Sequence, residues 1–126
     1  MTTTRFPFAG LGRCEAVISE GLVFAVATDP LSADGIVPQT RNTLAELSRI
    51  LAEAGSGHAG LLQATVYLAD IKDKPEMDAV WIEWIGSEEH WPQRACVGVD
   101  LYQSCLIEVV VTAKVLSGTV PTRRDA

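Results

Sequence analysis

The spacing of apolar residues changes repeatedly along this chain, between the two-residue period of a β-strand and the three- and four-residue period of an α-helix. Residues 15–28 hold two short apolar runs separated by turn-forming residues at 19–21, which predicts a β-hairpin. From Pro38 to Ala54, apolar residues recur at helical spacing until two nearby glycines stop the pattern. This half of the chain is therefore predicted to form two paired strands followed by an amphipathic helix.

The second half of the chain shows the same change of period. Residues 61–69 alternate apolar and polar side chains and predict a strand. Residues 73–85 carry an apolar stripe at helical spacing and predict a second helix, and residues 94–101 and 106–115 predict two final strands. The expected order of elements is ββαβαββ.

This order favours one architecture. Strands and helices are interleaved, and each helix must cover one face of a sheet, so the economical fold is α+β, a two-layer sandwich with both helices on one face. With 126 residues the chain suits a single domain, residues 1–126, in which the polar segment 117–126 is expected to be a frayed tail.

Charge and composition exclude several classes of function. The formal net charge is −6 and no cluster of basic residues occurs, so a nucleic-acid partner is not expected. No secretory signal and no apolar run of membrane-spanning length is present, which predicts a soluble, cytoplasmic protein with no membrane partner. The three cysteines have no C-x-x-C spacing and the two histidines lie far apart, so a metal site is not expected.

The last two predicted strands carry the candidate functional residues. Alternation puts Arg94 and Cys96 on one face of their strand and the apolar residues between them on the other, so we expect Arg94 and Cys96 to point away from the helices. Glu108 is a lone carboxylate in an apolar run, and Arg94 is its candidate partner. On spacing alone, an ion pair that fixes the register between subunits is the commoner explanation, and Cys96 on its own is more often a small buried apolar residue.

Several motifs together resemble one family. The segments Pro38-Gln39-Thr40-Arg41-Asn42-Thr43-Leu44, Val66-Tyr67-Leu68-Ala69-Asp70, Pro92-Gln93-Arg94-Ala95-Cys96-Val97 and Ile107-Glu108-Val109 are similar to segments of the reactive-intermediate deaminase family, also called the YjgF or UK114 family. The resemblance covers residues 38–113. Its most specific element is P-x-R-x-C-V followed at this distance by I-E.

The resemblance implies a fold like that of the trimeric chorismate mutases, a homotrimer with a central barrel-like core and three clefts between subunits. By motif position, Arg94 is implied to hold the carboxylate of a small imine or enamine, and Glu108 to position or activate water. The implied reaction hydrolyses 2-imino or enamino acids to 2-oxo acids and ammonium and requires no cofactor. The residues expected to bind the substrate are Arg94, Cys96, Trp91, Thr28 and Cys14.

The N-terminal third departs from the family pattern. Gly12-Arg13-Cys14 stands where typical members have Gly-Pro-Tyr, and Ala27-Thr28-Asp29 replaces Ser-Gly-Gln or Ser-Gly-Thr. Asp29 adds an acid near the expected cleft. The alternative function is therefore a trimer that binds a small acid without deaminating it, as a metabolite sensor or as an enzyme of another pathway. A pericyclic enzyme and a ribonuclease are weaker alternatives, and the acidic balance argues against the ribonuclease.

Overall fold

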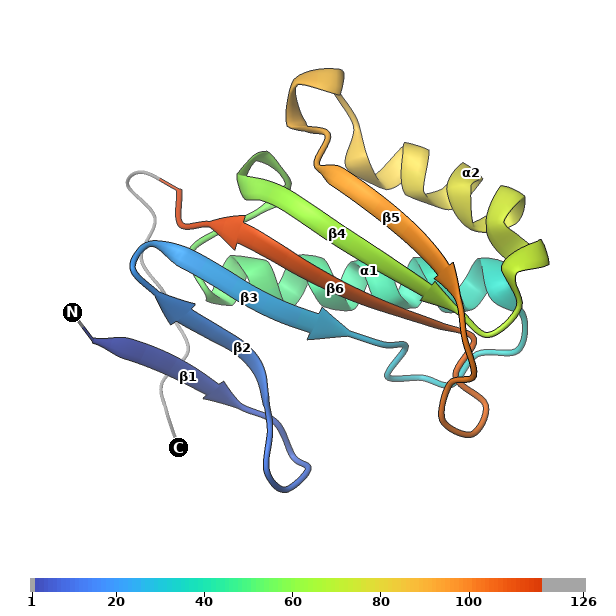
Figure 1. The fold of residues 1–126 in the computed structure, drawn as a ribbon, viewed down its shortest axis with the longest axis horizontal. Helices are drawn as coiled ribbons and strands as arrows, with labels where there is room; N and C mark the ends of the chain where they lie inside the picture. Colours follow the sequence, from blue (N-terminus) through green and yellow to red (C-terminus); the bar gives the residue numbers. More distant parts are fainter. Residues whose placement is uncertain (1, 117–126) are drawn as a thin grey trace.

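The computed structural model describes residues 2–116, so the tail predicted for residues 117–126 lies outside the described residues. These residues form a mixed sheet with strand order β1-β2-β3-β6-β4-β5, shown in Figure 1. The strands are β1 (Thr3–Pro7), β2 (Cys14–Ser19), β3 (Leu22–Ala27), β4 (Leu61–Leu68), β5 (Gln93–Gly98) and β6 (Ile107–Lys114). The helices are α1 (Ile36–Glu53) and α2 (Lys74–Ile85), and single 3-10 turns form η1 (His58–Gly60), η2 (Ile71–Asp73) and η3 (Glu88–His90).

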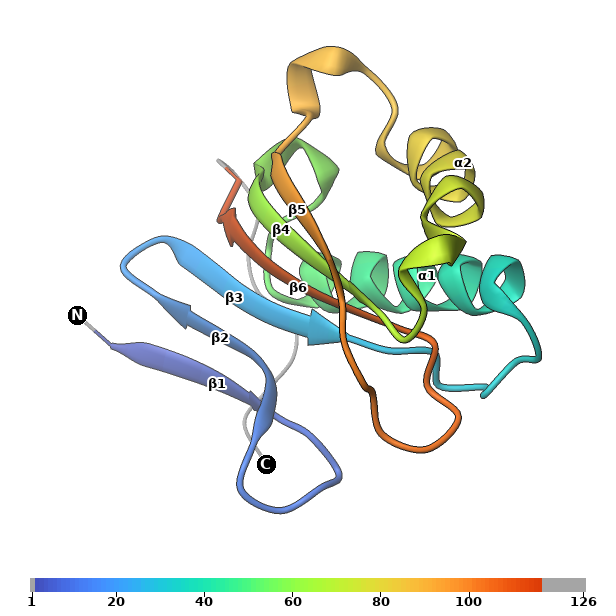
Figure 2. The same cartoon turned by 45° about the vertical axis from the view of Figure 1, so that its right-hand side comes forward.

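The two long helices pack against the same face of the sheet, as Figure 2 shows. β4 and β5 are parallel and are joined through α2, whereas the other neighbouring strands are antiparallel. The predicted α+β sandwich, with the chorismate-mutase-like arrangement that the resemblance implied, is confirmed.

The predicted hairpin is also confirmed. β2 and β3 are joined by the two residues Glu20 and Gly21, which both have positive φ, at 53° and 79°. A type I′ turn requires this conformation at both of its central residues, and it matches the twist of the flanking strands. The turn therefore fixes the register of the hairpin.

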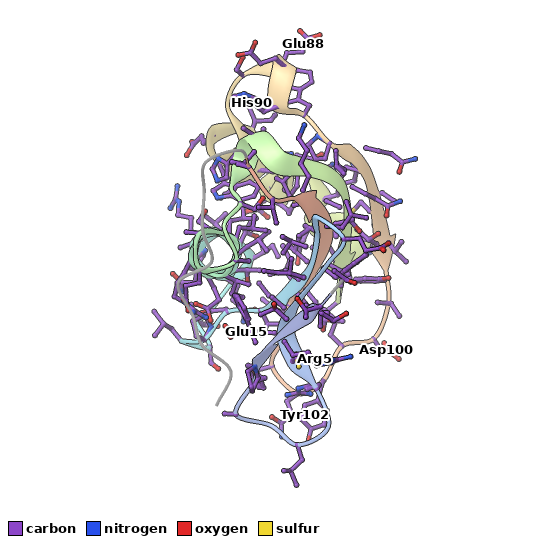
Figure 3. The ribbon with its side chains drawn as sticks, turned by 90° about the vertical axis from the view of Figure 1, so that its left-hand side faces the viewer. Arg5, Glu15, Glu88, His90, Asp100 and Tyr102 are labelled. Carbon is purple, nitrogen blue, oxygen red and sulfur yellow. The ribbon has the colours of Figure 1, made fainter. Side chains whose placement is uncertain are left out.

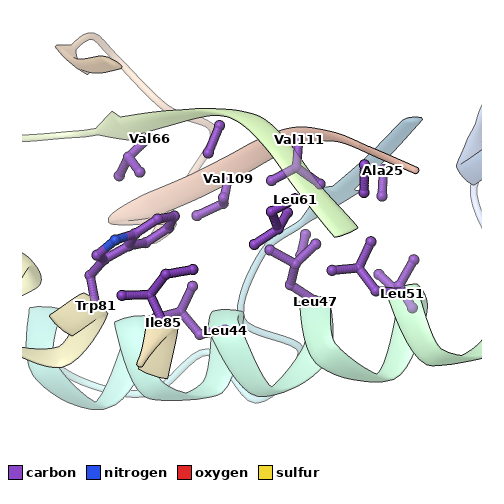
Figure 4. Packing of buried hydrophobic residues seen from close by; sticks show 14 of the residues in the cluster. Ala25, Leu44, Leu47, Leu51, Leu61, Val66, Trp81, Ile85, Val109 and Val111 are labelled. Atoms are coloured by element: carbon purple, nitrogen blue, oxygen red, sulfur yellow. The ribbon is translucent and has the colours of Figure 1, made fainter. Parts of the chain in front are cut away.

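The hydrophobic core lies between the sheet and the helices (Figure 4). Leu44, Leu47 and Leu51 of α1 face Val109 and Val111 of β6, and each of these side chains is at most 2% exposed. The helical spacing read from the sequence is thus the spacing that buries one face of α1.

β1 was not predicted. It is an edge strand that pairs with β2, and only Phe6 of its five residues is fully buried. A strand with one inward apolar side chain produces no alternation in the sequence, so the period test missed it. Among residues 2–116, no helix has the length and apolar composition needed to cross a membrane.

Candidate functional site

A cleft of about 430 Å³ opens where β3 ends and β6 begins. Its walls come from the β1–β2 loop, the segment after β3, α1 and the loop before β6. Figure 3 shows Tyr102 of that last loop at the end of the molecule opposite Glu88 and His90. The cleft is lined by Phe8, Arg13, Cys14, Glu15, Val26, Ala27, Thr28, Asp29, Pro30, Ser32, Gln39, Glu46, Ile50, Tyr102, Gln103, Ser104, Cys105 and Glu108.

Glu108 lies on the sheet face turned away from the helices, as predicted. It is in register with Tyr67, while its chain neighbours Ile107 and Val109 are buried on the helix side. The Glu108 side chain is half-buried and makes no hydrogen bond or ion pair with any other residue of the described range 2–116. With no partner in that part of the chain, its oxygens can accept a proton or a hydrogen bond from water or a ligand.

The other carboxylates of the cleft have partners within the chain. The two oxygens of Asp29 accept two backbone N–H groups of the following loop, each at 2.7 Å. Arg49 reaches Glu15 at 3.2 Å and Glu46 at 2.8 Å, and its hydrogen bond holds the pKa of Glu46 below the ordinary value. Both oxygens of the Asp29 carboxylate are thus hydrogen-bonded to the loop that follows it.

Gln39 of α1 links the segment after β3 to the loop before β6 through hydrogen bonds of its side-chain amide. Its amide donates to the carbonyls of Ala33 and Ser104 at 2.8 and 3.0 Å, and its carbonyl accepts the backbone N–H of Leu106 at 2.9 Å. The side chain is 2% exposed. Gln39 therefore fixes the loop before β6, and with it the start of the strand that carries Glu108.

A second charged group lies between β5 and α2. We call it the Arg94 cluster: Lys74, Asp78, Trp81, Arg94 and Cys96. Nη2 of Arg94 donates to Oδ1 of Asp78 at 2.6 Å, and Nζ of Lys74 donates to Oδ2 of the same carboxylate at 2.7 Å. The guanidinium lies 5.1 Å from the centre of the Trp81 ring, a cation–π distance.

The predicted orientation of Arg94 and Cys96 is wrong. Arg94 is in register with Ala64, which is 1% exposed and faces the helices, so Arg94 and Cys96 point toward α2. Ala95 and Val97, the residues that alternate with them, face outward, and Val97 is 41% exposed. β5 is an edge strand, and α2 offers it an acid and an aromatic ring, so Arg94 and Cys96 turn inward.

Arg94 and Glu108 therefore do not pair within one chain. They lie on opposite faces of the sheet, and the partner of Arg94 is Asp78.

The family comparison agrees with this fold. The model of the family described as Endoribonuclease L-PSP matches residues 14–115. The chain belongs to this family. Among curated relatives of this L-PSP family chain, a RutC family protein of Haemophilus ducreyi is 30% identical over 103 residues, which cover 80% of this chain and 87% of that protein. The RutC family protein YoaB of Escherichia coli is 33% identical over 95 residues, covering 75% and 82%.

Solved structures match the L-PSP family chain over nearly its whole length. A member of the YjgF family from Neisseria meningitidis has a TM-score of 0.81 and 33% identity, covering 100% of this chain and 98% of that one. A member of the YjgF/YER057c/UK114 family from Mycobacterium tuberculosis has a TM-score of 0.81 and 25% identity, covering 90% and 100%. These matches confirm the resemblance to the reactive-intermediate deaminase (YjgF) family, which processes small molecules.

The structure divides the predicted site residues of this L-PSP family chain between two places. Cys14, Thr28 and Glu108 line the cleft, whereas Arg94 and Cys96 belong to the Arg94 cluster. Trp91 precedes β5, is 58% exposed, and donates its indole N–H to the carbonyl of Gly86 at 3.0 Å.

Sequence reasoning missed Lys74, Asp78 and Gln39. The four-residue spacing of Lys74 and Asp78 on a predicted helix indicates an ion pair. No local signal connects that pair to Arg94.

Cys96 and Cys105 are not activated. Burial raises the pKa of the Cys96 thiol, and the nearby Arg94 and Lys74 offset this only in part. Burial likewise raises the pKa of Cys105, whose Sγ donates to the carbonyl of Ile107 at 3.2 Å. Both groups are thiols rather than thiolates at neutral pH, so neither is suited to act as a nucleophile.

Proposed function

We propose that the protein hydrolyses reactive 2-imino or enamino acids to 2-oxo acids and ammonium. The observation that carries this proposal is the state of Glu108. Its carboxylate is half-buried in the cleft and has no hydrogen-bond or ion-pair partner among residues 2–116. A free carboxylate in such a place is suited to accept a proton from an attacking water. Membership of the family supports the same reaction.

In the proposed mechanism Arg94 binds the carboxylate of the substrate and Glu108 orients a water. The water oxygen attacks the iminium carbon while its proton passes to Glu108. That proton then moves to the nitrogen of the tetrahedral adduct, and the C–N bond breaks to release ammonia. As the C=O bond forms, Glu108 takes the proton of the adduct's hydroxyl group and passes it to the ammonia, which leaves as ammonium. The net change converts iminium and water to ketone and ammonium. The steps are proton transfers and positioning, which the side chains of this chain can supply.

We further propose that the working site forms between copies of the chain in a homotrimer. Arg94 and Glu108 lie on opposite faces of one sheet, so a substrate that contacts both needs the Arg94 of a second copy. On the sheet face of Glu108, Phe24, Val97 and Val110 are 45%, 41% and 38% exposed. Exposed apolar side chains gathered on one face are typical of an interface. Light scattering on the purified protein is expected to give the mass of three chains, and a monomer would overturn this part.

The direct test measures ammonium release from imino acids that an amino-acid oxidase generates in the assay. Wild type is expected to accelerate release and Arg94→Ala to lose most of the acceleration, at equal verified assembly state. If wild type binds 2-oxo acids without accelerating release, the alternative of a non-deaminating small-acid-binding protein is the better description. If it neither binds nor accelerates, both descriptions fail.

A further inference from the structure

The guanidinium of Arg94 is held in place from the helix side. Its side chain is 19% exposed, with the Trp81 ring 5.1 Å from its central carbon and Sδ of Met77 3.8 Å from Nη1. Asp78 accepts from Nη2 at 2.6 Å. A guanidinium has five N–H donors, so this arrangement leaves others available for a second carboxylate.

Asp78 is shared between two cations. Its Oδ1 faces Arg94 and its Oδ2 accepts from Nζ of Lys74 at 2.7 Å, one helical turn away. Partial burial opposes ionisation of this carboxyl, but the hydrogen bonds from Lys74 and Arg94 outweigh it and hold the pKa of Asp78 below the ordinary value. Asp78 is therefore a fixed negative charge beside Arg94 over the whole neutral pH range.

We propose that Asp78 is a positioning residue that sets the affinity of Arg94 for a substrate carboxylate, and that Lys74 tunes this effect by competing for Asp78. The proposal rests on the proposed function, in which Arg94 is the carboxylate anchor. An incoming carboxylate meets the repulsion of Asp78 as well as the attraction of Arg94. Lys74 reduces that repulsion because it neutralises the other oxygen. The cluster thus favours ligands that can use several guanidinium donors at once over weakly binding anions.

Two substitutions with opposite expected effects test this proposal. Asp78→Asn keeps the oxygen that accepts from Arg94 but removes the charge, so the Kd of pyruvate, the smallest 2-oxo acid, is expected to fall roughly threefold to tenfold. Lys74→Met keeps the aliphatic stem but leaves Asp78 fully charged beside Arg94, so that Kd is expected to rise roughly twofold to fivefold. In ammonium release, both effects are expected in KM rather than in kcat.

Two further variants of this chain show whether the effects are specific to Asp78. Glu76→Gln removes the same charge from an exposed position of α2 that forms no hydrogen bond or ion pair with Arg94. It is expected to leave the pyruvate Kd within about twofold of wild type. In an Asp78→Asn background, Lys74→Met is expected to lose most of its effect, because the charge it modulates is gone. Thermal unfolding of each variant checks that it is folded.

Binding of pyruvate, measured by calorimetry, separates this proposal from the proposed reaction. If wild type releases no ammonium but the two substitutions shift the Kd in opposite directions, the role of Asp78 stands and the deaminase proposal fails. If wild type is active and both substitutions weaken binding, Asp78 and Lys74 only support the fold and the inference is overturned. It is also overturned if Arg94→Ala leaves the pyruvate Kd unchanged.

Discussion

The cleft around Glu108 and the Arg94 cluster differ in whether their candidate functional residue has a charged partner. In the cleft, Asp29 has partners inside the chain and Glu108 has none among residues 2–116. In the cluster, the cation Arg94 already has a partner in Asp78, which Lys74 shares. Under the proposed function, this difference corresponds to a division of roles, in which the unpartnered carboxylate accepts a proton and the partnered guanidinium is held in a fixed orientation to bind the substrate.

Substituting one residue from each region gives the largest expected effects. Glu108→Gln removes the proton acceptor and is expected to lower kcat for ammonium release by roughly 10²- to 10³-fold with little change in KM. Arg94→Ala removes the anchor and is expected to act mainly by raising KM, on the order of 10²-fold. Steady-state kinetics on the same imino acid measures both. If both variants mainly change kcat, or both mainly change KM, the proposed division of roles between Glu108 and Arg94 is wrong.

Mixing these two impaired variants, at a substrate concentration below the KM of Arg94→Ala, tests whether the regions act across copies of the chain. When Glu108→Gln and Arg94→Ala chains are unfolded and reassembled together in equal amounts, roughly a quarter of the shared sites would receive both intact residues, so about that fraction of activity is expected to return. Each variant reassembled alone is the control. Mixed assemblies that are confirmed by mass spectrometry and remain inactive would show that the site is not shared.

Gln39→Leu tests how far the cleft depends on one buried amide. The change leaves the backbone groups of Ala33, Ser104 and Leu106 without their partner, so the free energy of unfolding is expected to fall by about 2–4 kcal/mol. Urea denaturation measures it. Gln63→Leu, at an exposed position where the amide donates to the Gln93 side chain, is the matched control and should stay within about 0.5 kcal/mol of wild type.

The smallest expected effect concerns His58, which contacts both α1 and α2. Its ring packs on Trp84 with centroids 4.1 Å apart, and its Nε2 lies 3.2 Å from Oγ of Ser48. Burial, with a smaller contribution from His90, lowers the pKa of His58. The folded state therefore disfavours the charged ring, and the unfolded state binds more protons as pH falls.

Because the pKa of His58 is lowered in the folded state, this residue makes the protein less stable as pH falls. The contribution of His58 to stability is fully present above the pKa of the unfolded chain, about 6.5, and is lost as pH falls below it. The melting temperature of wild type is expected to drop between pH 7.5 and 5.5, and this drop should be smaller in His58→Gln. The depressed pKa of Asp78 affects stability only at more acidic pH. Equal slopes in wild type and the variant would contradict this account.

From β2 onward, the order of the strands and the two long helices could be read from the chain because it rests on local periodicity. The helix expected from Pro38 is observed from Ile36, the strand expected at 61–69 is observed at Leu61–Leu68, and the hairpin is observed with its turn at Glu20. In these segments one face is buried by the core, so hydrophobic spacing and structure coincide. The family motifs likewise pointed to Arg94 and Glu108 without any coordinates.

The face that Arg94 occupies could not be read in this way. A two-residue period says which side chains of a strand share a face but not which face is buried. Glu108 was placed correctly because its strand is central and its apolar neighbours must enter the core. For Arg94, on an edge strand, the choice was made by Asp78 and Trp81 of α2, which lie elsewhere in the sequence and offer an ion pair and an aromatic surface. The sequence by itself therefore determined the family, the candidate residues, both long helices and every strand except the edge strand β1. Only tertiary packing decided which of the candidate residues can meet, because it alone brings distant charges together.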